Sequence, residues 1–282
     1  TVIDTDNGAA GTIALGAVTA QGHSLTLDSG STAGATLALG SMADLSGGLT
    51  VRDAGGLATL TDLGGTTPGA VTIDQSRAGV TFAGNLDATT LTLTDTTGTI
   101  TFADGGDVDL TALSTAAQGY DVVIESSTLD VTNATTFTNT GTLTLGNEAA
   151  DALTFTGGLT ATAVDQVVLG GGTVSTTGAN NLSLGDANAE AVSVTADSTL
   201  GAGTGSIDLT DTVLADGASL TVGDGSATAI TMDAIAGTAS GTASDLTFNT
   251  TGTITVAESI GTDIGTLTLT QSGGATFEGA VT

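Results

Sequence analysis

The sequence predicts an all-β protein that folds as a right-handed parallel β-helix, or β-solenoid, of about 12 coils. One short word recurs along all 282 residues: an aliphatic residue, a small polar residue, then an aliphatic residue or phenylalanine. This period-two alternation is typical of strands with one buried and one solvent-facing side. Clusters of Gly, Asp and Asn, such as Asp104–Asp107 and Gly223–Gly225, separate the words and indicate turns.

The expected strands follow one another without any interval of helical period. In chain order they are Leu25–Leu27, Leu49–Val51, Val71–Ile73, Val80–Phe82, Leu91–Leu93, Ile100–Phe102, Leu129–Val131, Leu143–Leu145, Leu153–Phe155, Leu182–Leu184, Val192–Val194, Ile207–Leu209, Leu220–Val222, Ile230–Met232, Leu246–Phe248, Ile254–Val256 and Leu267–Leu269. The stretch Gly56–Gly69 departs from the pattern, and within it we expect Gly64–Gly69 to form a longer loop because Pro68 cannot sit inside a stacked strand.

The spacing of the words favours a solenoid over the alternative, a β-sandwich array. Two words with their turns span about 20 to 25 residues, which is the size of one coil of a parallel β-helix. Sandwich cores usually bury large aromatic residues, whereas this chain has six Phe, one Tyr and no Trp. The solvent-facing positions are Thr, Ser and Asp, as expected where like residues stack in ladders between coils. Because each coil buries its core only against its neighbours, we expect a single domain over residues 1–282.

Composition excludes several classes of function. The chain has 60 Thr and 43 Gly, and 30 acidic residues against two basic ones, Arg52 and Arg77, for a net charge of −28. A nucleic-acid partner is excluded because it requires a basic surface. Without cysteine, disulfides, thiol chemistry and cysteine-bound zinc are excluded as well. No stretch reaches about 18 consecutive apolar residues, so we expect no membrane insertion.

Acidic turns are the candidate metal sites. Asp4 and Asp6 open a segment that is similar to the start of a calcium loop, in which alternate carboxylates converge on a hard cation. Asp104 and Asp107 flank a Gly-Gly turn. Solvated turn residues are the alternative interpretation of all four. We therefore expect no required cofactor, and calcium is the candidate cation.

No enzyme is expected from this inventory. Paired carboxylates can hydrolyse glycosides, but β-helix enzymes that act on acidic polysaccharides need Lys, Arg or His to hold an anion. The two arginines of this chain are 25 positions apart in the sequence. We expect His23 to be a surface or turn residue and Tyr120 to be a partly exposed residue that covers the core.

The words of Gly79–Gly84 and Leu91–Phe102 resemble the β-strand-repeat segments of bacterial surface proteins of the filamentous haemagglutinin-like and autotransporter-passenger kind. The resemblance covers nearly the whole chain and is compositional. It implies a secreted right-handed parallel β-helix that acts as an adhesin, a matrix component or a stalk. The expected location is therefore extracellular or on the cell surface.

These observations predict a structural subunit of an extracellular fibre or of a surface or biofilm matrix. The alternative is a glycan- or cell-adhesive passenger segment of a larger adhesin, with glycans as partners. Because solenoids that exist as single molecules need polar caps, and Gly274–Val281 repeats the words of Gly79–Leu86, we expect copies to stack head to tail. A segment cut from a longer solenoid would have the same in-phase ends. The expected interface residues are Val2, Ile3, Ile13, Leu15, Phe277 and Val281.

Overall fold

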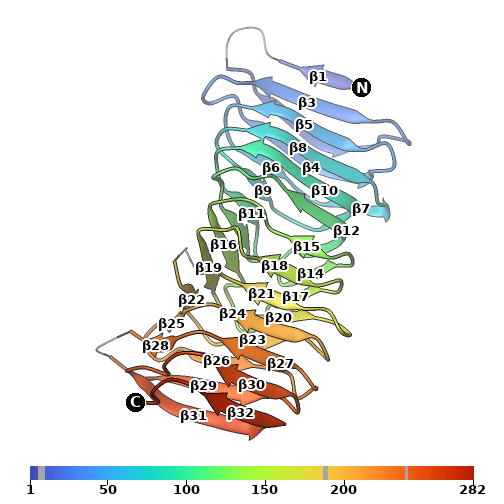
Figure 1. Cartoon of the computed structure of the whole chain (residues 1–282). Coiled ribbons are helices and arrows are strands. Elements are labelled where there is room, and N and C mark those ends of the chain that lie inside the picture. Colours follow the sequence, from blue (N-terminus) through green and yellow to red (C-terminus); the bar gives the residue numbers. More distant parts are fainter. Residues whose placement is uncertain (6–9, 187–189, 239–240) are drawn as a thin grey trace. The chain divides into compact units, whose positions relative to one another are not determined.

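The computed structural model describes residues 1–5, 10–186, 190–238 and 241–282, which form strands and turns and no helix (Figure 1). Parallel strands stack as a β-solenoid of about 12 turns. This confirms the predicted all-β class and the solenoid. None of the described residues belongs to a helix that could span a membrane.

The chain divides into two compact units. Unit 1 comprises Thr1–Thr132 and Thr138–Gly141, and unit 2 comprises Asn133–Phe137 and Thr142–Thr282. The strands of unit 1 are β1 (Val2–Asp4), β2 (Ile13–Val18), β3 (Leu25–Gly30), β4 (Leu37–Asp44), β5 (Leu49–Ala54), β6 (Ala58–Leu60), β7 (Leu63–Thr67), β8 (Ala70–Ser76), β9 (Val80–Phe82), β10 (Leu86–Thr96), β11 (Ile100–Phe102), β12 (Asp107–Thr115), β13 (Val122–Ile124) and β14 (Thr128–Val131).

Most strands of unit 2 have three or four residues. They are β15 (Thr135–Thr136), β16 (Thr142–Leu145), β17 (Ala152–Phe155), β18 (Leu159–Ala161), β19 (Gln166–Leu169), β20 (Gly172–Thr176), β21 (Leu182–Leu184), β22 (Val192–Val194), β23 (Ser198–Gly201), β24 (Ser206–Leu209), β25 (Thr212–Leu214), β26 (Ser219–Val222), β27 (Ala229–Met232), β28 (Ile235–Gly237), β29 (Ser244–Asn249), β30 (Thr253–Val256), β31 (Ile264–Gln271) and β32 (Gly274–Phe277).

Each turn of unit 1 has three strand positions, and each position forms one face of the solenoid. β1, β3, β5, β8 and the second half of β10 form one face. β2, β4, β6, β9, β11 and β13 form the next. The third face begins with the end of β2 and continues through the end of β4, β7 and the first half of β10. The word spacing suggested two strands per coil, because the third position contributes only one or two apolar residues in several turns and leaves little trace in the sequence.

Solvent-facing hydroxyl groups form a ladder on the first of these faces, as the composition predicted. Thr26, Thr50, Thr72 and Thr92 lie in register on successive strands. Successive parallel strands lie about 4.8 Å apart, so like residues stack directly on one another. The aliphatic residues on either side of each threonine point inward and are buried.

Unit 2 repeats the arrangement with three faces. β15, β18, β21, β24, β27, β30 and β32 form one of its parallel sheets. A second face runs through β17, β20, β23, β26, β29 and β31. The third runs through β16, β19, β22, β25 and β28, and isolated bridges extend it to Ile260 and Val281.

Turn residues tie each coil to the next at the corners. The Asp62 carboxylate accepts a hydrogen bond from the backbone N–H of Asn85 (3.2 Å), and the Asn85 amide oxygen accepts one from the N–H of Asp107 (3.0 Å). Gly79 has φ of 97°, and a Cβ there would collide with the backbone oxygen of Thr99 one turn later. The Gly, Asp and Asn clusters are therefore the residues that let coils stack closely.

The core contains rows of aliphatic side chains with phenylalanines at intervals. Phe82 and Phe102 stack on adjacent strands of unit 1 with ring centroids 5.0 Å apart. Tyr120 is only 1% exposed, so its expected role as a partly exposed residue is wrong. Burial is possible because the Tyr120 hydroxyl accepts a hydrogen bond from the N–H of Ala116 (3.0 Å), which satisfies its polar atom.

The stretch Gly56–Gly69 contains two strands, β6 and β7, and the sequence suggested a loop at Gly64–Gly69. Pro68 follows β7 and precedes β8, outside both strands. The prediction of a loop at Gly64–Gly69 is therefore wrong for Gly64–Thr67, which belong to β7. Proline interrupts the ladder only at its own position, and Leu60 and Leu63 still fill the core on either side of the corner.

Candidate functional site

The first turn of unit 1 carries core-type side chains that are only partly covered. Ile3 of β1 lies opposite Leu27, and Leu15 of β2 lies opposite Leu39. Leu27 and Leu39 are 0% and 1% exposed, whereas Ile3 and Leu15 are half-buried. The alternation directs these side chains inward, and the difference arises because they have a neighbouring turn on one side.

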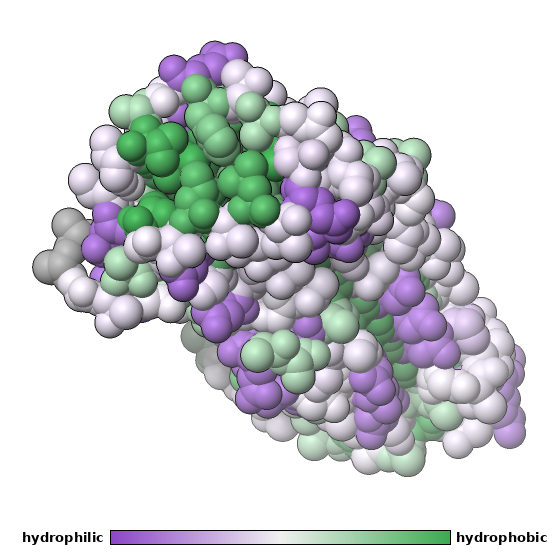
Figure 2. Space-filling view, turned by 90° about the horizontal axis from the view of Figure 1, so that it is seen from below, coloured by the Kyte–Doolittle hydropathy of each residue, from purple (hydrophilic) through white to green (hydrophobic). Residues whose placement is uncertain are grey.

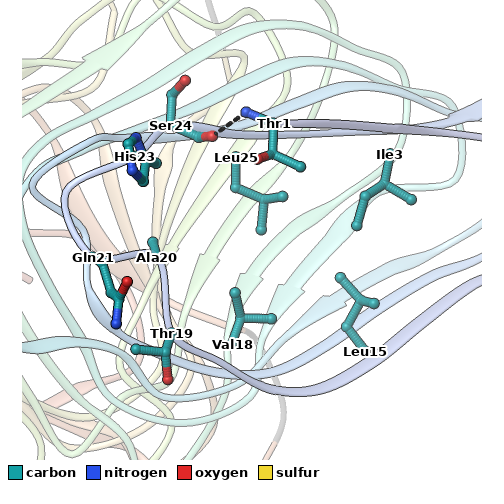
Figure 3. A pocket seen from close by; sticks show the side chains of 10 residues that line it. All are labelled: Thr1, Ile3, Leu15, Val18, Thr19, Ala20, Gln21, His23, Ser24 and Leu25. Carbon is teal, nitrogen blue, oxygen red and sulfur yellow. Dashed lines mark hydrogen bonds between the residues drawn. The ribbon is translucent and has the colours of Figure 1, made fainter.

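A cavity of about 330 Å³ opens in this turn. Figure 3 shows the side chains of Ile3, Leu15, Val18 and Leu25 pointing into it. The amine of Thr1 donates a hydrogen bond to the backbone oxygen of Ser24 (2.7 Å) at its rim. His23 also lines the cavity from the turn that precedes β3, as expected for a turn residue. Its apolar lining consists of side chains of the kind that fill the core in the following turns.

The last turn of unit 2 presents a second apolar surface. Leu269 of β31 is 41% exposed and Val281 is 54% exposed, and Leu267 and Phe277 are half-buried. Figure 2 shows apolar residues gathered into a compact patch on the face that is seen from below. The Phe277 ring lies 6.5 Å from that of Phe248, centroid to centroid. We call Leu267, Leu269, Phe277 and Val281 the C-terminal apolar surface.

The preceding turn shows that the C-terminal apolar surface consists of core-type side chains that no described residue covers. Leu246 and Phe248 of β29 pair in register with Leu267 and Leu269, and both are 0% exposed. The residue types and the inward direction are the same in both turns. A further turn of solenoid would therefore bury Leu269 as β31 buries Phe248.

Both surfaces are bordered by strand edges. β1 pairs with β3, and β31 and β32 pair with β29 and β30. Within the described residues, Figure 1 shows no further strand beyond β1 or beyond β31 and β32. Such edges carry N–H and C=O groups that can pair with another strand.

The expected interface residues occupy different positions in these surfaces. Ile3 and Leu15 line the cavity, whereas Ile13 is already buried at 3% exposed. Val2 is 55% exposed because it pairs with Thr26 and so stands in the outward hydroxyl ladder. The interface residues expected from the sequence did not include Leu269, although its inward direction follows from the Thr-Leu-Thr-Leu-Thr pattern of β31.

The expected acidic sites are dispersed. Asp4 pairs in register with Asp28, and Asp6 lies outside the described residues. Asp104 is in an exposed turn, and Asp107 accepts a hydrogen bond from the Thr128 hydroxyl (2.8 Å). In the part of the chain that the structure describes, no three His, Cys, Asp or Glu side chains are grouped as metal ligands. Calcium therefore stays a prediction.

Unit 1 contains a carboxylate ladder that the sequence did not predict. Asp87, Asp109 and Asp130 lie in register on β10, β12 and β14. Partial burial raises the pKa of Asp109, and the neighbouring carboxylates of Asp87 and Asp130 raise it further. The signal in the sequence is the aliphatic-Asp-aliphatic word at Val108–Leu110 and Leu129–Val131, but only the register stacks the two words.

A surface depression of about 350 Å³ in unit 1 is lined by Asp28, Arg52, Asp53, Asp74, Gln75 and Asp95, and Arg77 contacts two of these residues, Asp53 and Gln75. Arg52 pairs with Asp28 (3.4 Å), and the Arg77 Nε lies 3.8 Å from an oxygen of Asp53. The 25 positions between the arginines are about one turn of the solenoid, because β5 and β8 are paired strands. The distance between them in the sequence therefore did not indicate that they contact neighbouring residues. Both guanidinium groups face carboxylates, which leaves the depression acidic.

Comparison with known proteins yields no match to a family model, to a curated protein or to a solved structure.

Proposed function

We propose that this chain is a structural subunit that assembles head to tail into an extracellular fibre or a surface or biofilm matrix. The observation that carries the proposal is the pair of open apolar ends. The first turn of unit 1 has an apolar cavity, and the last turn of unit 2 has the C-terminal apolar surface. Each end offers what the other requires, namely a strand edge and uncovered core.

Energetics favour an assembly that depends on concentration. Complete burial of a Leu or Phe side chain stabilises by about 1.5–3 kcal/mol, and the half-buried residues of these surfaces would gain roughly half of that each. Each backbone hydrogen bond between strand edges adds about 0.5–1.5 kcal/mol. Association costs about 4–15 kcal/mol in lost freedom of motion. Several such residues and a strand ladder on each face are therefore needed together.

The charge and the fold of the chain support the proposed assembly, and the proposed extracellular location rests on the resemblance to bacterial surface proteins. A surface with 30 acidic residues against two basic ones repels other acidic chains, which keeps single subunits in solution until the ends meet. A solenoid stabilises itself by contacts between neighbouring turns and needs no bound group to fold. Contacts that repeat from copy to copy without closing on themselves produce filaments.

The alternative, a glycan-adhesive segment, lacks support from the aromatic residues. Sugar-binding surfaces commonly use exposed aromatic rings. Five of the six phenylalanines and Tyr120 are at most 1% exposed, and Phe277 belongs to the C-terminal apolar surface. Binding on a glycan array by the monomeric chain would favour this alternative.

The test is a sedimentation experiment on residues 1–282, with electron microscopy of the same samples. We expect a concentration-dependent series of oligomers that lengthen into filaments. Leu269→Asp should weaken association at least about tenfold, because it removes apolar contact worth about 1.4 kcal/mol or more and adds a charge to the joint.

A matched control is available in Leu57→Asp. Leu57 is 44% exposed, close to the 41% of Leu269, but it precedes β6 inside unit 1. This variant should assemble like the wild-type chain. A wild-type chain that stays monomeric at high concentration, with and without calcium, would refute the proposal. Equal loss of assembly in both variants would also count against it.

A further inference from the structure

The strand order within the end turns determines how two copies can meet. The last turn of unit 2 presents three strand positions in chain order: β31, β32 and the bridge at Val281. The first turn of unit 1 also presents three: β1, Ile13–Leu15 of β2, and Ala17–Val18 of β2. Two stacked turns therefore have three faces to match.

Resting on the proposed head-to-tail assembly, we propose that the joint matches these positions in chain order. β1 of one copy pairs with β31 of the copy before it, Ile13–Leu15 pairs with β32, and Ala17–Val18 lies on Val281. Within each unit, the strand that follows the third position lies on the first position of the turn before: β3 lies on β1, and β31 lies on β29. The proposed joint continues the same rule from one copy into the next.

The competing match places β1 on β32 and the start of β2 on Val281. In this match, the strand that reaches the face of β31 is the second half of β2, which comes two positions after β1. It therefore lies in the second layer of the joint, and the position directly above β31 receives no strand. Leu267 and Leu269 of β31 would stay uncovered. The in-order match leaves no strand position vacant, and it covers the residue of β31 that is 41% exposed.

The register at the middle face follows from inward-facing pairs. Ala275 and Phe277 of β32 face the core, because they pair with the buried Ile254 and Val256. Ile13 and Leu15 face the core of unit 1 in the same way, opposite Leu37 and Leu39. Both pairs are two positions apart. Ile13 therefore meets Ala275, and Leu15 meets Phe277.

The residues between these pairs face solvent and report the register. Ala14 lies between Ile13 and Leu15, Thr276 lies between Ala275 and Phe277, and both are exposed. In the in-order match, Ala14 of one copy lies beside Thr276 of the copy before it. In the competing match, Thr276 lies beside Val2, which also faces outward.

Disulfide trapping can separate the two matches, because the chain has no cysteine of its own. A disulfide requires Cα atoms about 4.4–6.8 Å apart, and in-register neighbours on paired strands are about 4.8 Å apart. We would mix an Ala14→Cys chain with a Thr276→Cys chain that carries a longer tag, oxidise gently, and separate the products on a non-reducing gel. The matched control mixes Val2→Cys with the same Thr276→Cys chain. All three substitutions are at exposed positions, and circular dichroism checks that each variant folds.

We expect about tenfold more mixed dimer from Ala14→Cys with Thr276→Cys than from the control mixture, because neighbours on a different face lie outside disulfide reach. More mixed dimer from Val2→Cys would overturn the in-order match and leave head-to-tail assembly standing. Filaments without a trapped dimer in either mixture would overturn it too. Failure of the wild-type chain to assemble would instead remove the proposed function on which the match rests.

Discussion

Replacing Phe102 by alanine should destabilise unit 1 strongly and locally. Phe102 is 0% exposed in β11, and its ring stacks on that of Phe82 at 5.0 Å with planes 17° apart. Removal of a buried phenylalanine ring costs about 3–5 kcal/mol. About 0.5–1.5 kcal/mol of that belongs to the ring pair.

The loss should remain near the substituted turn. In a solenoid, each turn contacts only its neighbours, so stability is approximately a sum of nearest-neighbour contributions. β11 pairs with β9 on one side and with β13 on the other. We therefore expect these three strands to open more often, while β24, β27 and β30 of unit 2 keep their protection.

Hydrogen exchange followed by mass spectrometry measures this distribution directly. A local loss of 3 kcal/mol or so corresponds to a fall in protection of about a hundredfold. Thr101→Ala is the matched control: its side chain is on the same strand, faces outward and is half-buried. Such a substitution should change stability by no more than about 0.5 kcal/mol.

Two results would refute the reasoning. If Phe102→Ala lowered protection equally in unit 1 and unit 2, the nearest-neighbour description would be wrong. If Thr101→Ala were as damaging as Phe102→Ala, the outward ladder rather than the core would carry the stability of this turn.

Three further predictions concern charge and access. The pKa of Asp109 is raised in the folded chain, so the folded state binds this proton more tightly and stability falls as pH rises through that pKa. Asp109→Asn should therefore raise Tm at pH 7 but not at pH 3 or so. An equal rise at both pH values would contradict the carboxylate ladder. Salt should raise the Tm of the wild-type chain by screening its carboxylates, and calcium that adds nothing beyond ionic strength would leave no case for specific sites at Asp4 or Asp107. Trypsin should leave the native chain nearly intact, because Arg52 lies within β5 and Arg77 directly follows β8; rapid loss of the full-length band would show that these strands open readily.

The sequence alone was sufficient for the class of fold and for the direction of most side chains. Alternation of apolar and polar residues is a local property of a strand. Leu246 and Phe248 could therefore be assigned to the core and Thr247 to the surface before any contact was known, and the structure agrees. The same local rule predicted the apolar character of both ends, including Ile3 and Phe277.

Which residues of successive turns lie side by side could not be predicted, because the corners of the solenoid differ in length. Bonded partners in successive turns are 20 positions apart at Ser76 and Thr96 but 26 apart at Gly178 and Thr204. The corners absorb these differences in length, so the separation of two residues in the sequence does not say whether they lie side by side. The stacking of Asp87 on Asp109 and the contact of Arg77 with Asp53 depend on this register.

What the sequence determined by itself is thus that the aliphatic-polar-aliphatic words form strands and which of their side chains face inward, since both follow from neighbours along the chain. The tertiary structure decided that a turn has three faces, that Tyr120 is enclosed, and that Leu269 and the cavity beside Ile3 are open. Those properties depend on whether another turn covers a residue, and coverage is set by strands more than twenty positions away.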